Sequence, residues 1–373
     1  MKKTLIALAA LAATGAFAQS SVTIYGVVDA SVMSLSNADS NATSSFGPGT
    51  TTGKSVTALA DSSIFSSVWG LRGSEDLGGG LSANFKVESD IQTNNGGQNQ
   101  NGLFRRAANV GVAGGFGGIN LGITINPIIA TNAALMPLAG NSVSTLTATA
   151  LNYADFFTKN AVTYTSPVIA GGLVAQIQYG LGNNTNDSSA GSMTAWSLNY
   201  VAGPLALRAA GENRTEAAAN TANSGSNATS ATAAAGAKDV VLVGAAYEFG
   251  PVKLGASWIN SKTATTFGGT KVERTATQLG ASYQATPAWL LGATYVSAES
   301  STLTNLQARY SLSKRTTLYG QYGSASNDAS GKVNFLALAM NTGNTPAVDV
   351  TNYGPVNSGG TQSGYNFGII HTF

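Results

Sequence analysis

The chain ends in a segment with a period of two, and the last residue is aromatic. Between residues 362 and 373 the alternate positions hold Tyr365, Phe367, Ile369, His371 and Phe373. This period is typical of a β-strand whose two faces meet different environments. An unpaired backbone group inside a bilayer costs several kcal/mol, so strands that face lipid must be paired on both edges. If such strands recur along the chain, their sheet has to close into a barrel.

The N-terminus has the features of an export signal. Two lysines precede an apolar run at residues 5–13, and a small-x-small cleavage site follows at residues 16–18. This pattern predicts a signal peptide over residues 1–18 and a mature β-barrel domain over residues 19–373. The run is too short to span a bilayer, and no later segment approaches 18 unbroken apolar residues, so we expect no transmembrane helix. Together, the two ends predict a multi-pass protein of the bacterial outer membrane.

The composition fits strands that have one face in lipid and one in water. Charged residues make up 10% of the chain, against about 25% in typical soluble domains. The 19 basic residues include two in the predicted signal, which leaves 17 against 17 acidic residues and a net charge of zero. This balance argues against nucleic acid as a partner, because phosphate binding requires a positive excess. Cysteine is absent, so disulfides and thiolate metal sites are excluded.

The period of two recurs along the chain, and charges recur on the face opposite the apolar residues. In residues 81–90, one face holds Leu81, Ala83, Phe85 and Val87, and the other holds Ser82, Asn84, Lys86, Glu88 and Asp90. The same alternation is found in residues 173–181, 241–249 and 306–312. In a membrane barrel, the polar face is the lumen.

Short and long connections alternate between the expected strands. Tight turns are expected at residues 74–80, 202–204, 250–251, 285–287 and 313–315, and long polar tracts at 36–61, 92–102, 182–191, 215–237, 263–271 and 327–362. Short turns on one rim and long loops on the other are typical of membrane barrels. The sequence predicts an all-β fold, a 16-stranded antiparallel transmembrane β-barrel, which is wide enough for an aqueous channel. Its strands are expected to start near residues 22, 62, 81, 103, 117, 160, 173, 192, 204, 238, 252, 272, 288, 302, 316 and 362.

Residues 126–159 stand where the third long loop is expected, and they differ from the other loops. The segment holds two prolines and many large apolar residues. A long loop with apolar content is expected to pack inside the protein. We therefore predict that this long third loop is folded into the lumen and narrows it. A loop that caps the mouth, or that contacts a neighbouring subunit, remains an alternative.

Several motifs resemble those of the general trimeric porins of β-proteobacteria, in order and over the whole chain. They are SSVTIYGVVDA (20–30), WGLRGSEDLGGGL (69–81), FKVES (85–89), GFGGINLG (115–122), VTYTSP (162–167), YSLSKRTTLYGQY (310–322) and FGIIHTF (367–373). The resemblance implies a homotrimer of 16-stranded barrels in outer-membrane lipid, with the third loop inside each barrel. It also implies passive diffusion of small hydrophilic solutes, often with a preference for anions. In that family the C-terminal aromatic, here Phe373, is part of the signal that the insertion machinery reads.

The resemblance further implies a constriction in which arginines face acidic residues. Arg106 matches one of the arginines, Glu88 matches the facing acidic position, and Arg72 matches the basic residue of the WGLRG strand. We predict a pore constriction formed by Arg106, Arg105, Arg72, Glu88, Lys86 and Asp155.

Three positions depart from the pattern of family arginines. Val68 replaces one arginine, Ile123 follows Gly122 where Gly-Arg is usual, and Phe157 or Thr158 falls near a third. These losses predict a weak anion preference.

No catalytic, cofactor or metal site is expected. The sole histidine, His371, lies two residues from the C-terminus, no glycine-rich segment opens a helix, and the acidic residues are scattered. Three functions remain open, of which a general diffusion channel is favoured. The alternatives are a substrate-selective channel for an uncharged or partly apolar small solute, and a structural or adhesive protein with a plugged barrel.

Overall fold

The computed structural model describes residues 21–38, 54–98, 102–138, 156–182, 187–217, 236–264, 268–328 and 360–373. The predicted signal peptide and Asp155 lie outside the described residues. Within these described residues, one helix, α2 (Pro127–Leu135), accompanies the strands. The strands are β1 (Ser21–Ala38), β2 (Lys54–Asp61), β3 (Val68–Gly78), β4 (Leu81–Asp90), β5 (Ala107–Gly114), β6 (Gly117–Ile125), β7 (Phe157–Thr165), β8 (Leu173–Gly180), β9 (Met193–Ala202), β10 (Leu205–Arg214), β11 (Lys238–Phe249), β12 (Val252–Thr263), β13 (Val272–Gln284), β14 (Trp289–Ala298), β15 (Ser301–Ser311), β16 (Thr316–Asn327) and β17 (Thr361–Thr372).

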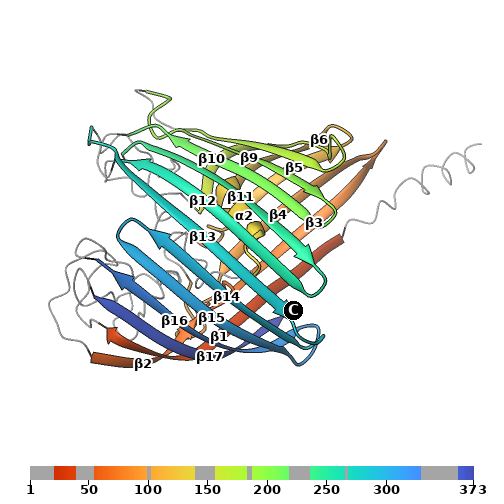
Figure 1. Cartoon of the computed structure of the whole chain (residues 1–373). Coiled ribbons are helices and arrows are strands. Elements are labelled where there is room, and N and C mark those ends of the chain that lie inside the picture. Colours follow the sequence, from red (N-terminus) through yellow and green to blue (C-terminus); the bar gives the residue numbers. More distant parts are fainter. Residues whose placement is uncertain are drawn as a thin grey trace, which may run out of the picture.

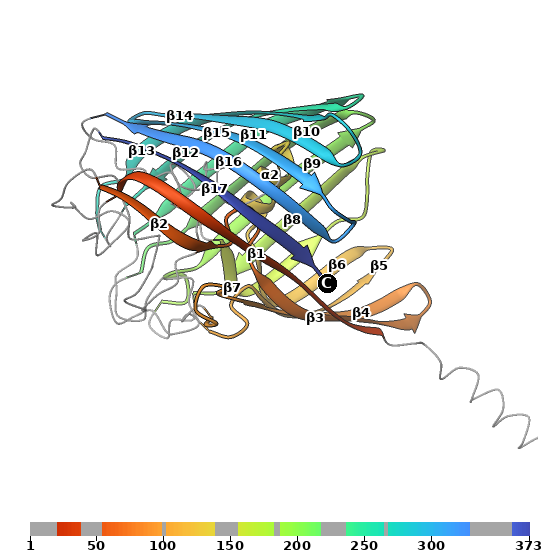
Figure 2. The same ribbon diagram turned by 90° about the horizontal axis from the view of Figure 1, so that it is seen from below.

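The strands form a closed antiparallel barrel (Figures 1 and 2). The last strand closes on the first, from Val27↔Thr372 to Leu35↔Gly364, which confirms the closure expected from the sequence. In the part of the chain that the structure describes, seventeen strand segments fill 16 positions, because β2 and β3 share one edge of β1. β3 pairs with the first part of β1, and β2 pairs with its second part.

One predicted strand start was wrong. We expected a strand from Ser62 after a loop over residues 36–61, but β2 already occupies Lys54–Asp61 and β3 begins at Val68. Residues 62–67 leave the sheet because several of their backbone groups bond to the side chain and backbone of Asp29 instead of a neighbouring strand. The strand expected near Leu103 begins at Ala107, after two arginines.

The alternation assigned from the sequence matches the two faces of the barrel. Large apolar side chains such as Phe367 (66% exposed) and Val110 (57% exposed) point outward, as lipid-facing residues should. Polar residues such as Gln178 and Asn366 are on the inner face and fully buried. Tight turns at one rim use glycines with left-handed backbone, including Gly203 (φ 56°) before Pro204.

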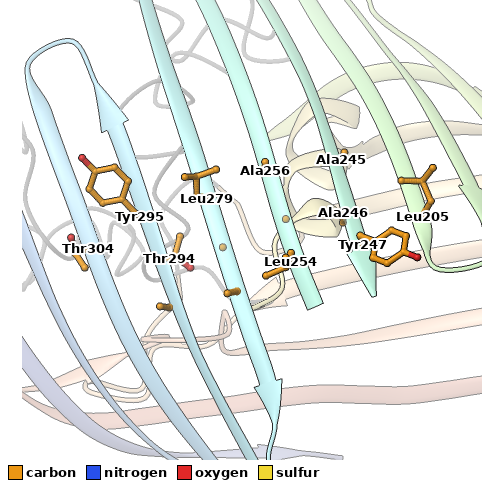
Figure 3. Close-up of a pocket in the computed structure, with 14 residues that line it drawn as sticks. Leu205, Ala245, Ala246, Tyr247, Leu254, Ala256, Leu279, Thr294, Tyr295 and Thr304 are labelled. Carbon is orange, nitrogen blue, oxygen red and sulfur yellow. The ribbon is translucent and has the colours of Figure 1, made fainter. Parts of the chain in front are cut away.

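An apolar hollow of about 540 Å³ lies on the outer wall across β10–β15 (Figure 3). Small residues such as Ala245 and Ala256 line it, and larger ones such as Leu205, Tyr247 and Leu279 surround them. Figure 3 shows α2 behind these strands, on the other side of the wall. The hollow therefore belongs to the lipid-facing surface. In the described part of the chain, no helix is long and apolar enough to cross a membrane.

Candidate functional site in the barrel lumen

Two carboxylates at the end of β4 form the centre of the charged part of the lumen. Glu88 and Asp90 are buried, and each is paired with an arginine that directly precedes β5. Arg106 Nε lies 2.9 Å from Glu88 Oε1, and its Nη1 lies 3.3 Å from Asp90 Oδ1. Arg105 Nε bonds to the other oxygen of Asp90. The β4–β5 hairpin thus brings together residues that are 15 to 18 positions apart.

Two further basic residues extend this group toward the turn rim. Lys86 Nζ lies 2.9 Å from Glu88 Oε2, and Tyr25 of β1 donates a hydrogen bond of 2.8 Å to the same oxygen. Arg72 Cζ stands 5.1 Å from the centre of the Tyr25 ring, within cation–π range. The sequence predicted Arg72 and Lys86 but missed Tyr25. The sequence does hold a hint of its place in the lumen, because Tyr25 has the spacing that puts it on the same face of β1 as Asp29.

The charged cluster is defined as Arg72, Lys86, Glu88, Asp90, Arg105 and Arg106. Three of its cations pair with the two carboxylates, and the fourth, Arg72, stands over the Tyr25 ring beside them. Burial lowers the pKa of Arg105 from its ordinary value, and the Asp90 carboxylate opposes that shift. Arginine remains protonated at neutral pH under such shifts. The cluster therefore carries an excess of positive charge on one wall of the lumen, where low-dielectric surroundings strengthen its field.

An aromatic residue from the far end of the third loop covers both arginines. The Phe157 ring centre lies 5.1 Å from Arg106 Cζ and 5.7 Å from Arg105 Cζ. The sequence analysis placed Phe157 or Thr158 near the position of a further family arginine. Phe157 supplies a ring that stacks on Arg105 and Arg106. Next to it, the Phe156 carbonyl accepts a hydrogen bond of 2.9 Å from Asn126 N, which joins the start and end of the loop.

The opposite part of the lumen is lined by α2, a helix that the sequence analysis did not predict. Asn126 caps it, because its Oδ1 accepts a hydrogen bond of 3.0 Å from Ile128 N. Proline at the first helical position, Pro127, completes a recognisable start signal that we overlooked. Asn126 Nδ2 also donates a 2.7 Å hydrogen bond to Glu212 of β10. The cap therefore anchors the helix to the inner wall.

Glycines on the inner face of β11, β12 and β13 let this segment approach closely. A Cβ added at Gly255 would stand 2.2 Å from the Leu135 carbonyl oxygen, and one at Gly244 would stand 2.6 Å from Leu135 Cδ1. At Gly280 an added Cβ would meet Pro137 Cδ at 2.8 Å. The first part of the third loop, residues 126–138, thus lies inside the barrel. Residues 139–155 lie outside the described residues, and their path remains a prediction.

The comparisons with known proteins agree with this geometry. The Gram-negative porin family matches residues 4–330. The chain belongs to this family. It is 30% identical to outer membrane porin protein 32 of Delftia acidovorans, with full coverage of both chains. The anion-selective porin from Comamonas acidovorans has a similar structure, with a TM-score of 0.75, 26% identity, and coverage of 95% of this chain and 100% of that chain.

A more distant structure shares the fold alone. The trimer form of OmpT, an outer membrane protein of Vibrio cholerae, has a TM-score of 0.66 and 16% identity over 95% of this chain and 99% of that one. Family and fold together place the porin in the outer membrane as a β-barrel channel. The proteins of this family and fold are channels and not enzymes.

Of the positions where the porin departs from the family arginines, Val68 faces the lumen. It pairs with Asp90 and is 6% exposed, so a neutral side chain stands beside the charged cluster. Ile123, which follows Gly122 where the resembled porins have Gly-Arg, faces outward. It pairs with Ala108, two residues from the outward pair Val110↔Leu121, and therefore shares their outward face. Gly122 (φ 125°) and an irregularity in the pairing with β7 follow at this point.

The sole histidine of the porin lies on the outward face of the terminal strand, as the sequence suggested. His371 is exposed, and its Nδ1 stands 3.0 Å from Thr316 Oγ1. Among the described residues, no group of three or more histidine, aspartate or glutamate side chains is placed to hold a metal ion.

Proposed function

We propose that the porin forms a water-filled channel for passive diffusion of small hydrophilic solutes and ions, with a weak preference for anions. The charged cluster is the observation that carries this proposal. It holds four cations and two carboxylates on one wall of the lumen, with Lys86, Arg105 and Arg106 paired to the carboxylates and Arg72 beside Tyr25. A net positive ring in a narrow channel attracts anions, because the low-dielectric walls focus its field.

The preference is expected to be weak for two reasons. Both carboxylates are engaged by arginines, so much of the positive field is neutralised locally. Val68 supplies no charge where the resembled porins carry an arginine. Salt should reduce the remaining preference, since the Debye length is about 10 Å at 0.1 M ionic strength.

The alternative, a channel for an uncharged or partly apolar solute, was motivated by the apolar third loop. The buried positions of α2 include Ile128, Ile129 and Leu135, and the helix packs against β8–β12. Their burial accounts for the apolar character of this part of the loop without an apolar solute. We therefore favour the general diffusion channel.

We further propose that the porin acts as a homotrimer in outer-membrane lipid and that the insertion machinery recognises its terminal aromatic residue. The trimer form of OmpT supports trimer formation on this fold. Phe373 closes the barrel, because its N–H and C=O both bond to Gly26 at 3.1 Å. The outward faces of the last strand carry exposed Tyr365, Phe367 and Ile369.

Planar-bilayer recordings across a salt gradient test the proposed function. We expect a modest reversal potential on the anion side that falls as the mean salt concentration rises. In liposome swelling, small uncharged sugars of similar size should enter at rates similar to one another. Absence of conductance from folded protein would favour a plugged barrel. Competition by one apolar solute that abolishes the current would favour the selective channel.

A further inference from the structure

Residues 62–67, between β2 and β3, cross the inner face of the barrel. Ile64 is fully buried and packs against Tyr319 of β16 and Ile370 of β17. Both partners face the lumen, because their neighbours Leu318 and Ile369 are exposed on the outside. The segment therefore passes from the β3 side of β1 across to the inner surface of β16 and β17.

The carboxylate of Asp29 holds this segment in place. Asp29 lies on β1, is fully buried, and accepts hydrogen bonds at Oδ2 from the backbone N–H groups of Ile64 (2.6 Å) and Phe65 (2.8 Å). Its other oxygen accepts a 2.6 Å hydrogen bond from the Tyr319 hydroxyl. Hydrogen bonds to an ionised acceptor are stronger than those between neutral groups. Asp29 thus joins the segment to two strands of the wall.

Serines join the two ends of segment 62–67 to each other and to β1. Ser62 N donates to the Asp29 carbonyl at 3.0 Å, and Asp29 N donates to Ser67 Oγ at 3.0 Å. Ser67 N in turn donates to Ser62 Oγ at 2.8 Å. Ser62 has a left-handed backbone (φ 60°), which is uncommon for a residue with a side chain and persists where the surroundings enforce it. The inward excursion is therefore fixed at both ends.

The partly exposed end of the segment carries an aromatic ring beside a cation. Arg309 Cζ of β15 lies 5.3 Å from the centre of the Phe65 ring. Arg309 Nε also donates a 2.6 Å hydrogen bond to Gln307 Oε1. The ring and the guanidinium lie on the β15–β17 side of β1, whereas the charged cluster lies on the β3–β5 side. The two groups thus flank β1 on the same inner surface.

We propose that segment 62–67 is a second constricting element of the pore and that Asp29 is its positioning residue. This inference rests on the proposed function as a water-filled channel. Phe65 limits the clearance, and Asp29 keeps it there by satisfying two adjacent backbone N–H groups. The charge of Asp29 is secondary to its role as a hydrogen-bond acceptor.

Two substitutions separate the acceptor role from the charge. Asp29→Asn removes the charge but keeps an oxygen for Ile64 N and Phe65 N, and its amide can donate to the Tyr319 oxygen. Asp29→Ala removes both the charge and the acceptor and leaves two buried N–H groups unpaired. Asp76→Asn serves as the matched control, because Asp76 is an exposed aspartate that accepts from Gly78 N at the turn.

The first readout is the position of residue 65, measured without any current. The chain has no cysteine, so Phe65→Cys introduces a single thiol. With a water-soluble maleimide on folded protein, we expect labelling to be roughly tenfold faster or more when Asp29→Ala is added, since unpaired buried donors free the segment. Asp29→Asn and Asp76→Asn should label at the rate of Phe65→Cys alone. If Asp29→Ala does not fold, Tyr319→Phe, which removes one of the three hydrogen bonds, should give a smaller increase. Equal labelling in all variants would overturn the positioning role.

The second readout is transport. Phe65→Ala should raise single-channel conductance and admit larger sugars in liposome swelling, and Asp29→Ala should do the same with a noisier open state. Asp29→Asn should leave the size limit unchanged. If Asn and Ala at position 29 shift the reversal potential equally and leave the size limit alone, Asp29 acts only as a fixed charge and the proposal fails. An unchanged limit in Phe65→Ala would also overturn it. Lack of conductance in the wild type would refute the proposed function, and the labelling result would still decide the role of Asp29.

Discussion

The wall of the barrel and the segments that fold into it are held by different interactions. The wall is a continuous ladder of backbone hydrogen bonds between neighbouring strands. The inward segments, residues 62–67 and 126–138, are held mainly by side chains that bond to backbone or to other side chains, such as Asp29 and Asn126. Ladder pairing determines whether a barrel exists in lipid, because open edges are costly there. The inward contacts should determine what passes through it.

This difference predicts two kinds of variant. A change in the wall should alter the number of folded channels and leave the properties of each channel intact. A change at an inward contact should alter conductance or selectivity and leave the amount of folded protein nearly unchanged. Variants at wall residues that touch an inward segment, such as Gly255, test whether the amount of folded protein and the properties of the channel can be changed separately.

Deletion of Phe373 should have the largest effect. It removes both hydrogen bonds between Phe373 and Gly26 at the closure of the barrel and the ring that covers Gly26. Unpaired backbone groups in lipid cost several kcal/mol each, so we expect a marked loss of folded, heat-modifiable trimer in the outer membrane. The few channels that do assemble should show wild-type conductance in bilayers. Normal trimer levels on gels would contradict this prediction, and altered conductance would break the separation between wall and lumen.

Replacement of Gly255 by Val should give the next largest effect. A Cβ there would stand 2.2 Å from the Leu135 carbonyl, so the chain after α2 must move away from the wall. Because β12 itself can keep its ladder, the barrel should fold while the size limit for sugars in liposome swelling changes. Gly115→Val is the control, since an added Cβ at Gly115 meets nothing within 4 Å. An unchanged size limit would show that the segment at Leu135 does not define the pore.

The wall could be predicted largely from the sequence, and the inward segments only in part. Alternation repeats over every strand and each turn is local, so strand starts such as Leu81, Gly117, Leu173 and Val252 were predicted at the observed residue. The start near Ser62 was wrong because hydrogen bonds from a distant aspartate removed residues 62–67 from the ladder. No local pattern contains that information.

The charged cluster shows the same limit. Arg72, Glu88 and Arg106 were named from a resemblance, and Lys86 and Arg105 were predicted beside them. The structure brings the five together around β4. Tyr25 and Asp29 were missed because each lies on β1, far in sequence from its partners. Pairing across the sheet, which cannot be read from the sequence, decides the partners of both residues.

Replacement of Arg106 by Gln should change selectivity without changing the number of channels. Arg106 bridges Glu88 and Asp90, so its loss removes one positive charge and uncovers part of two negative ones. A unit charge about 4 Å from an ion in water is worth about 1 kcal/mol, which corresponds to about fivefold in the ratio of anion to cation permeability. In a salt gradient, we expect the zero-current potential to shift in the direction of cation preference, by an amount that corresponds to this change of about fivefold in the permeability ratio. Lys314→Gln, in the turn between β15 and β16, is a control that removes one positive charge outside the charged cluster. A similar shift in that variant would show that the charged cluster does not set the selectivity.

Replacement of Val68 by Arg should give the smallest and opposite shift. Val68 faces the lumen in register with Asp90, so the new guanidinium would join the charged cluster where the resembled porins carry an arginine. Asp90 already binds two arginines, and it would share its charge with a third, so the gain in anion preference should be less than the loss in Arg106→Gln. Val68 is 6% exposed, and a larger side chain in a packed site lowers the stability of the folded protein by about 1–3 kcal/mol. Val68→Gln adds similar bulk without charge and isolates this effect. If Val68→Gln and Val68→Arg give the same zero-current potential, the field at this position does not act on passing ions.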